Sequence, residues 1–178
     1  MSLASVRLEP IPSTTLATEF GTFVLQYHVV GYRQLGGKGY ISLSMGDLQK
    51  DASLVRLQSA CAFAAFRSLE CDCGTQLQRA LSSIAEEQRG VLIYGLDDEG
   101  RGAGIEAKVA GMYVEHALRC SSDEAYQQLG LERDYRTFKD EAAILKRLKI
   151  ATHIRLIGSE DKCRALEDAG FMVERIHG

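Results

Sequence analysis

The sequence contains no tryptophan, only two prolines and no excess of basic residues. Both prolines, Pro10 and Pro12, lie in the first dozen residues, so we expect this N-terminal stretch to be extended. The formal net charge of −3 gives no general basic surface that would attract nucleic acid or an anionic membrane. No apolar run approaches the roughly 20 residues of a membrane span, and the start lacks the apolar stretch of a secretion signal. We therefore expect a cytoplasmic protein that binds neither nucleic acid nor membranes.

Five cysteines are an odd number for a disulfide framework. Three of them, Cys61, Cys71 and Cys73, lie close together in a C-x9-C-x-C arrangement. Three thiolates can hold Zn²⁺ and leave its fourth position to water, which is the pattern of a catalytic site. The alternative is a set of buried small apolar side chains. On a strand, Cys71 and Cys73 would share a face, which favours joint ligation. Cys120 and Cys163 have no such neighbours and are expected to be ordinary thiols.

The two halves of the chain differ in the period of their apolar residues. The first half reads as strands at residues 20–30, 40–44 and 54–57. The second half has helical spacing over 75–87, 105–118, 139–148 and 161–169, with short strands at 91–94, 154–157 and 171–173. Arg89-Gly90 reads as a cationic last turn followed by a C′ glycine. We expect one α/β domain over residues 1–178, with a mixed sheet, a strand-rich N-terminal half and alternating helices and strands in the C-terminal half.

Two further segments carry groups suited to binding or catalysis. Residues 99–104 form a glycine-rich turn between a strand and a helix, where backbone N–H groups can approach an anion. The turn matches neither a P-loop nor a full dinucleotide fingerprint, and a tight turn needs such glycines in any case. In an extended segment, the side chains of Asp134 and Arg136 point the same way. Without further context, the pair is better interpreted as a surface ion pair than as part of a site.

Taken together and in this order, these segments resemble GTP cyclohydrolase II, which opens the imidazole ring of GTP at the start of riboflavin synthesis. The resemblance is carried by SLECDCGTQLQRALSSIAEEQRGVLIY at residues 68–94, DDEGRGAGIEAK at 97–108 and QQLGLERDYRTF at 127–138. Weaker similarity extends from Glu19 to Ile176.

The resemblance implies a zinc enzyme that acts on a small-molecule nucleotide and forms a homodimer. It assigns Cys61, Cys71 and Cys73 to zinc. It assigns the nucleotide contacts to Arg56, Ser59, Gln76, Glu99, Gly100 and Arg101, of which Arg56 and Ser59 belong to the loop that receives the phosphates. Asp134 and Arg136 match the family's general base and nucleophile. A guanidinium is always protonated, so a bidentate phosphate clamp is the simpler role for Arg136, and both roles stay open.

The departures from the family pattern are concentrated around the cysteines. Near the first ligand the family reads approximately RVHSECLTGD, whereas residues 56–65 read RLQSACAFAA. This alanine-rich loop lacks the oxygen ligands that Mg²⁺ prefers, which argues against Mg²⁺ as a second cofactor. Glu70 replaces an arginine, a change that Arg67 could offset.

Two departures lie further along the chain. The family's active-site tyrosine falls on Met112, and the neighbouring Tyr113 is rotated by about 100° on a helix. In residues 158–163 the family's proline and asparagines are missing, and its lysine is displaced or lost.

We therefore expect a diverged zinc-dependent hydrolase that opens the imidazole ring of a purine nucleotide, with a GTP-like guanine nucleotide favoured. Because a thioether has no proton to give, we expect it to stop at the formylated ring-opened product. The alternatives are a hydrolase of another base or phosphorylation state, including pyrimidine ring opening, and a non-catalytic nucleotide-binding zinc protein. The signature of zinc deaminases is absent from the sequence.

Overall fold

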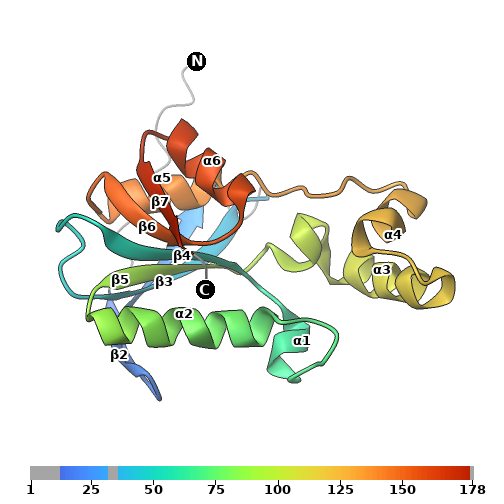
Figure 1. Ribbon diagram of the computed structural model, residues 1–178, viewed down its shortest axis with the longest axis horizontal. Coiled ribbons are helices and arrows are strands. Elements are labelled where there is room, and N and C mark those ends of the chain that lie inside the picture. The colour runs from blue at the N-terminus through green and yellow to red at the C-terminus, as the bar shows by residue number, and fades with distance from the viewer. Residues whose placement is uncertain (1–12, 32–35, 177–178) are drawn as a thin grey trace.

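The computed structural model describes residues 13–31 and 36–176, so Pro10, Pro12 and the stretch expected to be extended lie outside the described residues. The described residues form a seven-stranded mixed sheet in the order β1-β2-β3-β5-β4-β6-β7 (Figure 1). The strands are β1 (Thr14–Thr18), β2 (Gly21–Val30), β3 (Lys38–Met45), β4 (Ser53–Ser59), β5 (Gly90–Gly95), β6 (His153–Ile157) and β7 (Met172–Ile176).

The sheet has an antiparallel part and a parallel part. β1, β2 and β3 form an antiparallel meander, and β3 continues antiparallel to β5. β5, β4, β6 and β7 all run parallel to one another. The expected single α/β domain with a mixed sheet is therefore confirmed.

Helices cover both faces of the sheet, as the helical periods predict. α2 (Cys73–Glu87) is the crossover from β4 to β5 and packs its buried residues, such as Ile84, on one face. α5 (Lys139–Arg147) and α6 (Glu160–Asp168) cover the opposite face (Figure 1). Buried apolar side chains of the central strands fill both layers of the core.

A smaller unit stands to one side of these layers (Figure 1). It consists of the 3₁₀ helix η2 (Glu99–Gly102), α3 (Gly104–Leu118) and α4 (Ser122–Gln128), and α3 packs mainly on η2 and α4. The short helix α1 (Ala62–Ala65) follows β4. Within the described ranges, no helix is long and apolar enough to cross a membrane.

The turn after α2 differs from the prediction. The left-handed residue that ends α2 is Gln88, with a φ of 53°, rather than the expected Gly90. Gly90 instead begins β5 with a φ of 155°, and a Cβ there would lie 2.6 Å from the carbonyl oxygen of Leu54. Glycine is therefore required at this position by the close approach of β4.

Three of the parallel strands place the loops that follow them at one edge of the sheet. In parallel sheets, ligands bind in the crevice beyond the carboxyl ends of the strands. Here β4 leads to Cys61, β5 leads to Glu99, and β6 leads to Ser159. Residues far apart in the sequence are brought together at this edge.

Candidate active site

A cavity of about 510 Å³ lies beyond the carboxyl ends of β4, β5 and β6. Its lining includes all but one of the residues that the sequence singles out for the site. These are Arg56, Ser59, Cys61, Cys71, Cys73, Gln76, Glu99, Gly100, Arg101 and Arg136. The exception, Asp134, is hydrogen-bonded to Arg136 at the edge of the cavity.

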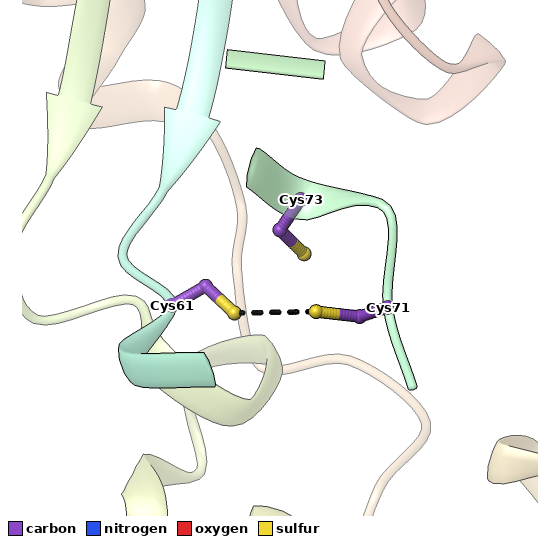
Figure 2. Close-up of side chains that lie close together, drawn as sticks. All are labelled: Cys61, Cys71 and Cys73. Carbon is purple, nitrogen blue, oxygen red and sulfur yellow. Dashed lines mark hydrogen bonds between the residues drawn. The ribbon is translucent and has the colours of Figure 1, made fainter. Parts of the chain in front are cut away.

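The three cysteine side chains converge on one point (Figure 2). Their sulfur atoms all lie within 4.8 Å of one another, and the Sγ atoms of Cys61 and Cys71 are 3.7 Å apart. A tetrahedral zinc site with Zn–S bonds of about 2.3 Å has S···S edges of about 3.8 Å, so this donor set fits zinc. The expected shared strand face is wrong, because Cys71 lies in a loop and Cys73 is the first residue of α2. Among the described residues, no fourth histidine, cysteine or carboxylate belongs to this group.

Lys108 on α3 connects the thiols to Glu99. Its ammonium group donates to Cys61 Sγ at 3.0 Å and to Glu99 Oε1 at 2.7 Å. Burial acts to raise the pKa of Cys61, but the hydrogen bonds from Lys108, from the backbone N–H of Ala64 and from the other two thiols together outweigh it and hold that pKa below its usual value. Burial and the neighbouring thiols raise the pKa of Cys73 to about 12. Cys61 is therefore held as the thiolate more readily than Cys73, and a metal ion must displace protons to bind all three sulfur atoms.

Glu99 uses both carboxylate oxygens within the protein. Oε1 accepts from Lys108, and Oε2 accepts from the backbone N–H of Ala62 at 2.6 Å. Gly100 and Arg101 follow in the left-handed region, with φ values of 58° and 57°. The hydroxyl group of Tyr126 donates to Gly100 O at 3.0 Å and fixes this turn.

The guanidinium group of Arg101 is directed toward α4. It donates to Asp123 Oδ1 at 2.5 Å and to Arg133 O at 3.1 Å, and lies 5.4 Å from the centre of the Tyr126 ring. Arg101 therefore lines the cavity while it ties the turn of η2 to α4.

Arg56 occupies a central strand that is otherwise suited to apolar residues. It is buried and donates to Gln58 Oε1 at 2.8 Å, to Ile157 O at 3.1 Å and to Gln76 Oε1 at 2.6 Å. Gln76 in turn donates to Asp72 Oδ2 at 2.6 Å. This chain of polar groups forms the floor of the cavity.

Asp134, Arg136 and Ser59 form a third group. The guanidinium group of Arg136 donates to both carboxylate oxygens of Asp134, and its Nη1 donates to Ser59 Oγ at 2.8 Å. Burial acts against the charge of Arg136, but Asp134 outweighs it and raises the pKa of Arg136. Burial also acts to raise the pKa of Asp134, and the bonds from Arg136 outweigh it, so that this pKa is lowered. Both groups are therefore held in their charged forms.

A family model described as GTP cyclohydrolase II matches residues 9–177 of the chain. The chain belongs to the GTP cyclohydrolase II family. A GTP cyclohydrolase-2 from Tolumonas auensis is 36% identical over 178 residues, which cover 98% of this chain and 86% of that protein. One from Neisseria meningitidis is 34% identical over 172 residues, which cover 95% of this chain and 84% of that protein.

Two longer proteins also match this member of the GTP cyclohydrolase II family. The riboflavin biosynthesis protein RibBA of Aquifex aeolicus is 36% identical over 95% of this chain, which spans 41% of that protein. The solved structure of RibBX, a two-domain 3,4-dihydroxy-2-butanone 4-phosphate synthase from A. baumannii, has a TM-score of 0.54. That structure is 19% identical and covers 98% of this chain and 41% of its own, so it shows the fold alone.

The structure also locates the positions where this GTP cyclohydrolase II family member departs from the family pattern. Met112 lines the cavity, whereas Tyr113 is 75% exposed and lies outside the lining, as the helical rotation between neighbours predicts. Glu70 lines the cavity, but Arg67 borders a separate hollow with Glu19, so Arg67 does not offset the acidic change.

Sequence reasoning missed two groups of the cavity wall. Lys162, in the segment where the family's lysine was expected to be displaced or lost, is buried and lines the cavity. Its ammonium group donates to Leu57 O at 2.7 Å. Asp98 is 2% exposed and accepts from Lys38 at 3.1 Å. Asp98 lies in the loop after β5, and Lys162 lies in the first turn of the helix after β6, so their places after parallel strands are the signal that could have identified them.

Proposed function

We propose that the protein is a zinc-dependent hydrolase that opens the imidazole ring of a guanine nucleotide. The observation that carries this proposal is the convergence of three thiols, Glu99 and Arg136 on one cavity in a member of this family. Bound to the three thiols, zinc would supply a water molecule made nucleophilic near neutral pH. The lack of a fourth ligand among the described residues supports a catalytic rather than a purely structural site.

The remaining roles are assigned to side chains of the cavity. Glu99 and Gln76 line the cavity, and beyond their bonds within the protein each carboxylate oxygen keeps a second lone pair and the amide keeps a second N–H, which we assign to the edge of the guanine base. Arg136 is protonated and is held in place by Asp134, with Nη1 facing the cavity, so we assign it to binding a phosphate through Nη1 rather than to nucleophilic attack. Asp134 orients that fork and remains ionised as a proton acceptor. The loop from Cys61 to Ala65 offers no side-chain oxygen, so Mg²⁺ is not part of this proposal.

The expected product is the formylated ring-opened nucleotide. Release of formate requires a second attack, in which the amine leaving group must receive a proton. Met112 lines the cavity and has no proton to donate, and the phenol of Tyr113 points away. The apolar loop at Cys61 also argues against efficient release of pyrophosphate, so the phosphates stay on the product.

Mass spectrometry of the products tests this proposal directly. The zinc-loaded protein is offered GTP, GMP and pyrimidine nucleotides, with Cys71→Ser as the matched control. A product heavier than the guanine nucleotide by one water supports the proposal. If only a pyrimidine nucleotide is turned over, the substrate is a pyrimidine rather than a guanine nucleotide. If zinc and nucleotides bind but no nucleotide is turned over, the protein is a non-catalytic nucleotide-binding protein.

The proposal includes a homodimer in the cytoplasm. Ile105, Val109 and Tyr113 lie at four-residue spacing on α3 and expose an apolar stripe, which we assign to a second copy of the chain. All five cysteines are free, which suits a reducing compartment. Light scattering should give the mass of a dimer for the unmodified chain and of a monomer for Val109→Glu.

A further inference from the structure

Phe138 precedes α5 in a backbone conformation that is unusual for a residue of its size. Its φ is 57° and its ψ is 11°, which is the left-handed region that favours glycine. Among the described residues other than glycine, it is the only aromatic one with a positive φ. Its carbonyl oxygen accepts from the backbone N–H of Ala142 at 3.2 Å and so closes the first turn of α5. A bulky side chain in this conformation is strained, so contacts of its ring must offset the strain.

The ring of Phe138 is contacted by two cations that come from different elements. The central guanidinium carbon of Arg136 lies 5.4 Å from the centre of the ring, and the ammonium nitrogen of Lys162 on α6 lies at the same distance. A cation within about 6 Å of the face of an aromatic ring is attracted to it. In the described part of the chain, no other ring has two such contacts.

The ring lies behind the cavity wall rather than in it. Arg136 and Lys162 both line the cavity, whereas Phe138 is absent from the lining and is 6% exposed. It packs in the core layer that α5 and α6 cover. Phe138 can therefore affect a ligand in the cavity only through the two cations that it contacts.

Lys162 depends strongly on this contact, because its hydrogen bond goes to a neutral group. Its ammonium group donates to the carbonyl oxygen of Leu57 at 2.7 Å. Burial, together with repulsion from Arg56 and Arg136, lowers the pKa of Lys162 to about 7, against the opposing effect of nearby carboxylates. The face of an aromatic ring stabilises an ammonium group without neutralising it, so the charge remains available to a ligand.

Arg136 is fixed by polar groups on one side and by the ring on the other. Asp134 and Ser59 bond its guanidinium group, and the backbone N–H of Tyr135 donates to Arg101 O at 2.9 Å. An arginine fork is planar and packs well on an aromatic ring. Together, these contacts determine the direction in which Nη1 of Arg136 points.

We infer that Phe138 is a positioning residue of the active site, whose ring holds Arg136 and Lys162 in place in the cavity wall. A leucine would fill much of the same core volume but would offer no ring to the two cations. The part that concerns the nucleotide rests on the proposed function, whereas the hold on the two cations does not.

Fluorinated phenylalanines at position 138 separate the electrostatic role of the ring from its packing. Each added fluorine weakens the negative potential of the ring face and changes the size of the ring little. We expect mono-, di- and trifluorinated rings in the zinc-loaded, full-length protein to weaken the binding of inorganic pyrophosphate stepwise, by about tenfold over the series. Calorimetric titration measures this. Phe171 is the control position, because it is buried in the same core layer and contacts no cation of the described residues.

Two ordinary substitutions provide a second measurement. Phe138→Tyr retains the ring and should bind pyrophosphate nearly as well as the unmodified protein, whereas Phe138→Leu should bind it about tenfold more weakly. An affinity that is constant over the fluorinated series, the same decrease at position 171, or no binding to the unmodified protein would overturn the role of Phe138.

Kinetics with the same proteins distinguish this inference from the proposed function. KM for GTP should rise in the order of fluorine number, by about tenfold over the series, while kcat changes less. A protein whose affinity for pyrophosphate follows the fluorine number but which turns over no nucleotide would refute the proposed function and keep the role of Phe138. Turnover of GTP with a KM and a pyrophosphate affinity that are both constant over the series would do the reverse.

Discussion

The guanidinium group of Arg136 lies fork against fork on the carboxylate of Asp134, with Nε 2.8 Å from Oδ1 and Nη2 2.6 Å from Oδ2. The backbone N–H of Arg136 also donates to Oδ1 at 2.9 Å. This leaves Nη1, which donates to Ser59, as the part of the fork that faces the cavity. The pair holds a positive charge in a fixed direction, and its geometry depends on the planar shape of arginine.

Arg136→Lys should therefore be damaging although it conserves the charge. An ammonium group cannot bond both oxygens of Asp134 and reach Ser59 in the same plane, so kcat/KM should fall about 100-fold. Steady-state kinetics check this, with Arg133→Lys as the control because Arg133 is 73% exposed in its ion pair. Unchanged kcat/KM in Arg136→Lys would contradict the assigned role.

Cys71→Ser should abolish both zinc binding and ring opening. The hydroxyl group of serine is a poor replacement for a thiolate, and only two sulfur ligands remain. Metal analysis after dialysis should give about one zinc per chain for the unmodified protein and for Cys120→Ser, which lies outside the cluster. Full zinc content in Cys71→Ser would refute the ligand set.

Met112→Tyr should partly restore the release of formate. The substitution places a phenol in the cavity wall, and a missing general acid costs about 10²–10⁴ in rate. Formate is measured by a coupled assay, and Tyr113→Phe serves as the control because its side chain faces away from the cavity. Stoichiometric formate from the unmodified protein would show that another group donates this proton.

Glu141→Gln should change the pH dependence of stability. Burial, together with Asp98 and Asp140, raises the pKa of Glu141 to about 7, against the opposing effect of Lys38. The folded state therefore binds more protons than the unfolded state between about pH 4.5 and pH 7, and this contribution to stability falls as the pH rises. Burial lowers the pKa of His28 to about 4, which gives the opposite slope over nearly the same range.

Subtracting the unfolding free energy of the unmodified protein from that of Glu141→Gln at each pH removes the contribution of His28, which both proteins share. The remaining pH dependence comes from the carboxyl group of Glu141. Urea unfolding should show the variant gaining about 3 kcal/mol relative to the unmodified protein between pH 4.5 and pH 8. A difference that is constant with pH would show that Glu141 titrates normally.

The sequence predicts the helices of the layers well, because α2, α5 and α6 each carry a clear apolar stripe. It misses α4, whose seven residues are mostly polar, although Ser121 and Glu124 form a capping box that could have indicated its start. It also misses β1, an exposed edge strand with little apolar patterning.

Candidate site residues were predictable where their spacing is local. Cys71 and Cys73 are two positions apart, and the choice between Met112 and Tyr113 follows from helical rotation alone. The place of Lys162 depends on the pairing of β6 with β4, which no local pattern specifies. Local spacing can also mislead: Arg67 is only three positions from Glu70, which lines the cavity, but Arg67 itself borders a separate hollow.

The bridge formed by Lys108 gives the outlying helices a second attachment to the sheet. α3 packs mainly on η2 and α4, while the ammonium group of Lys108 bonds Cys61 at the end of β4. Zinc on the three thiols, as proposed, would also tie the segment that carries Cys61 to Cys73 of α2, so its removal should let amide hydrogens along α3 exchange with deuterium faster, while those of α5 keep their protection. Local unfolding of α3, a helix that supplies no ligand, would then report whether the metal site is occupied.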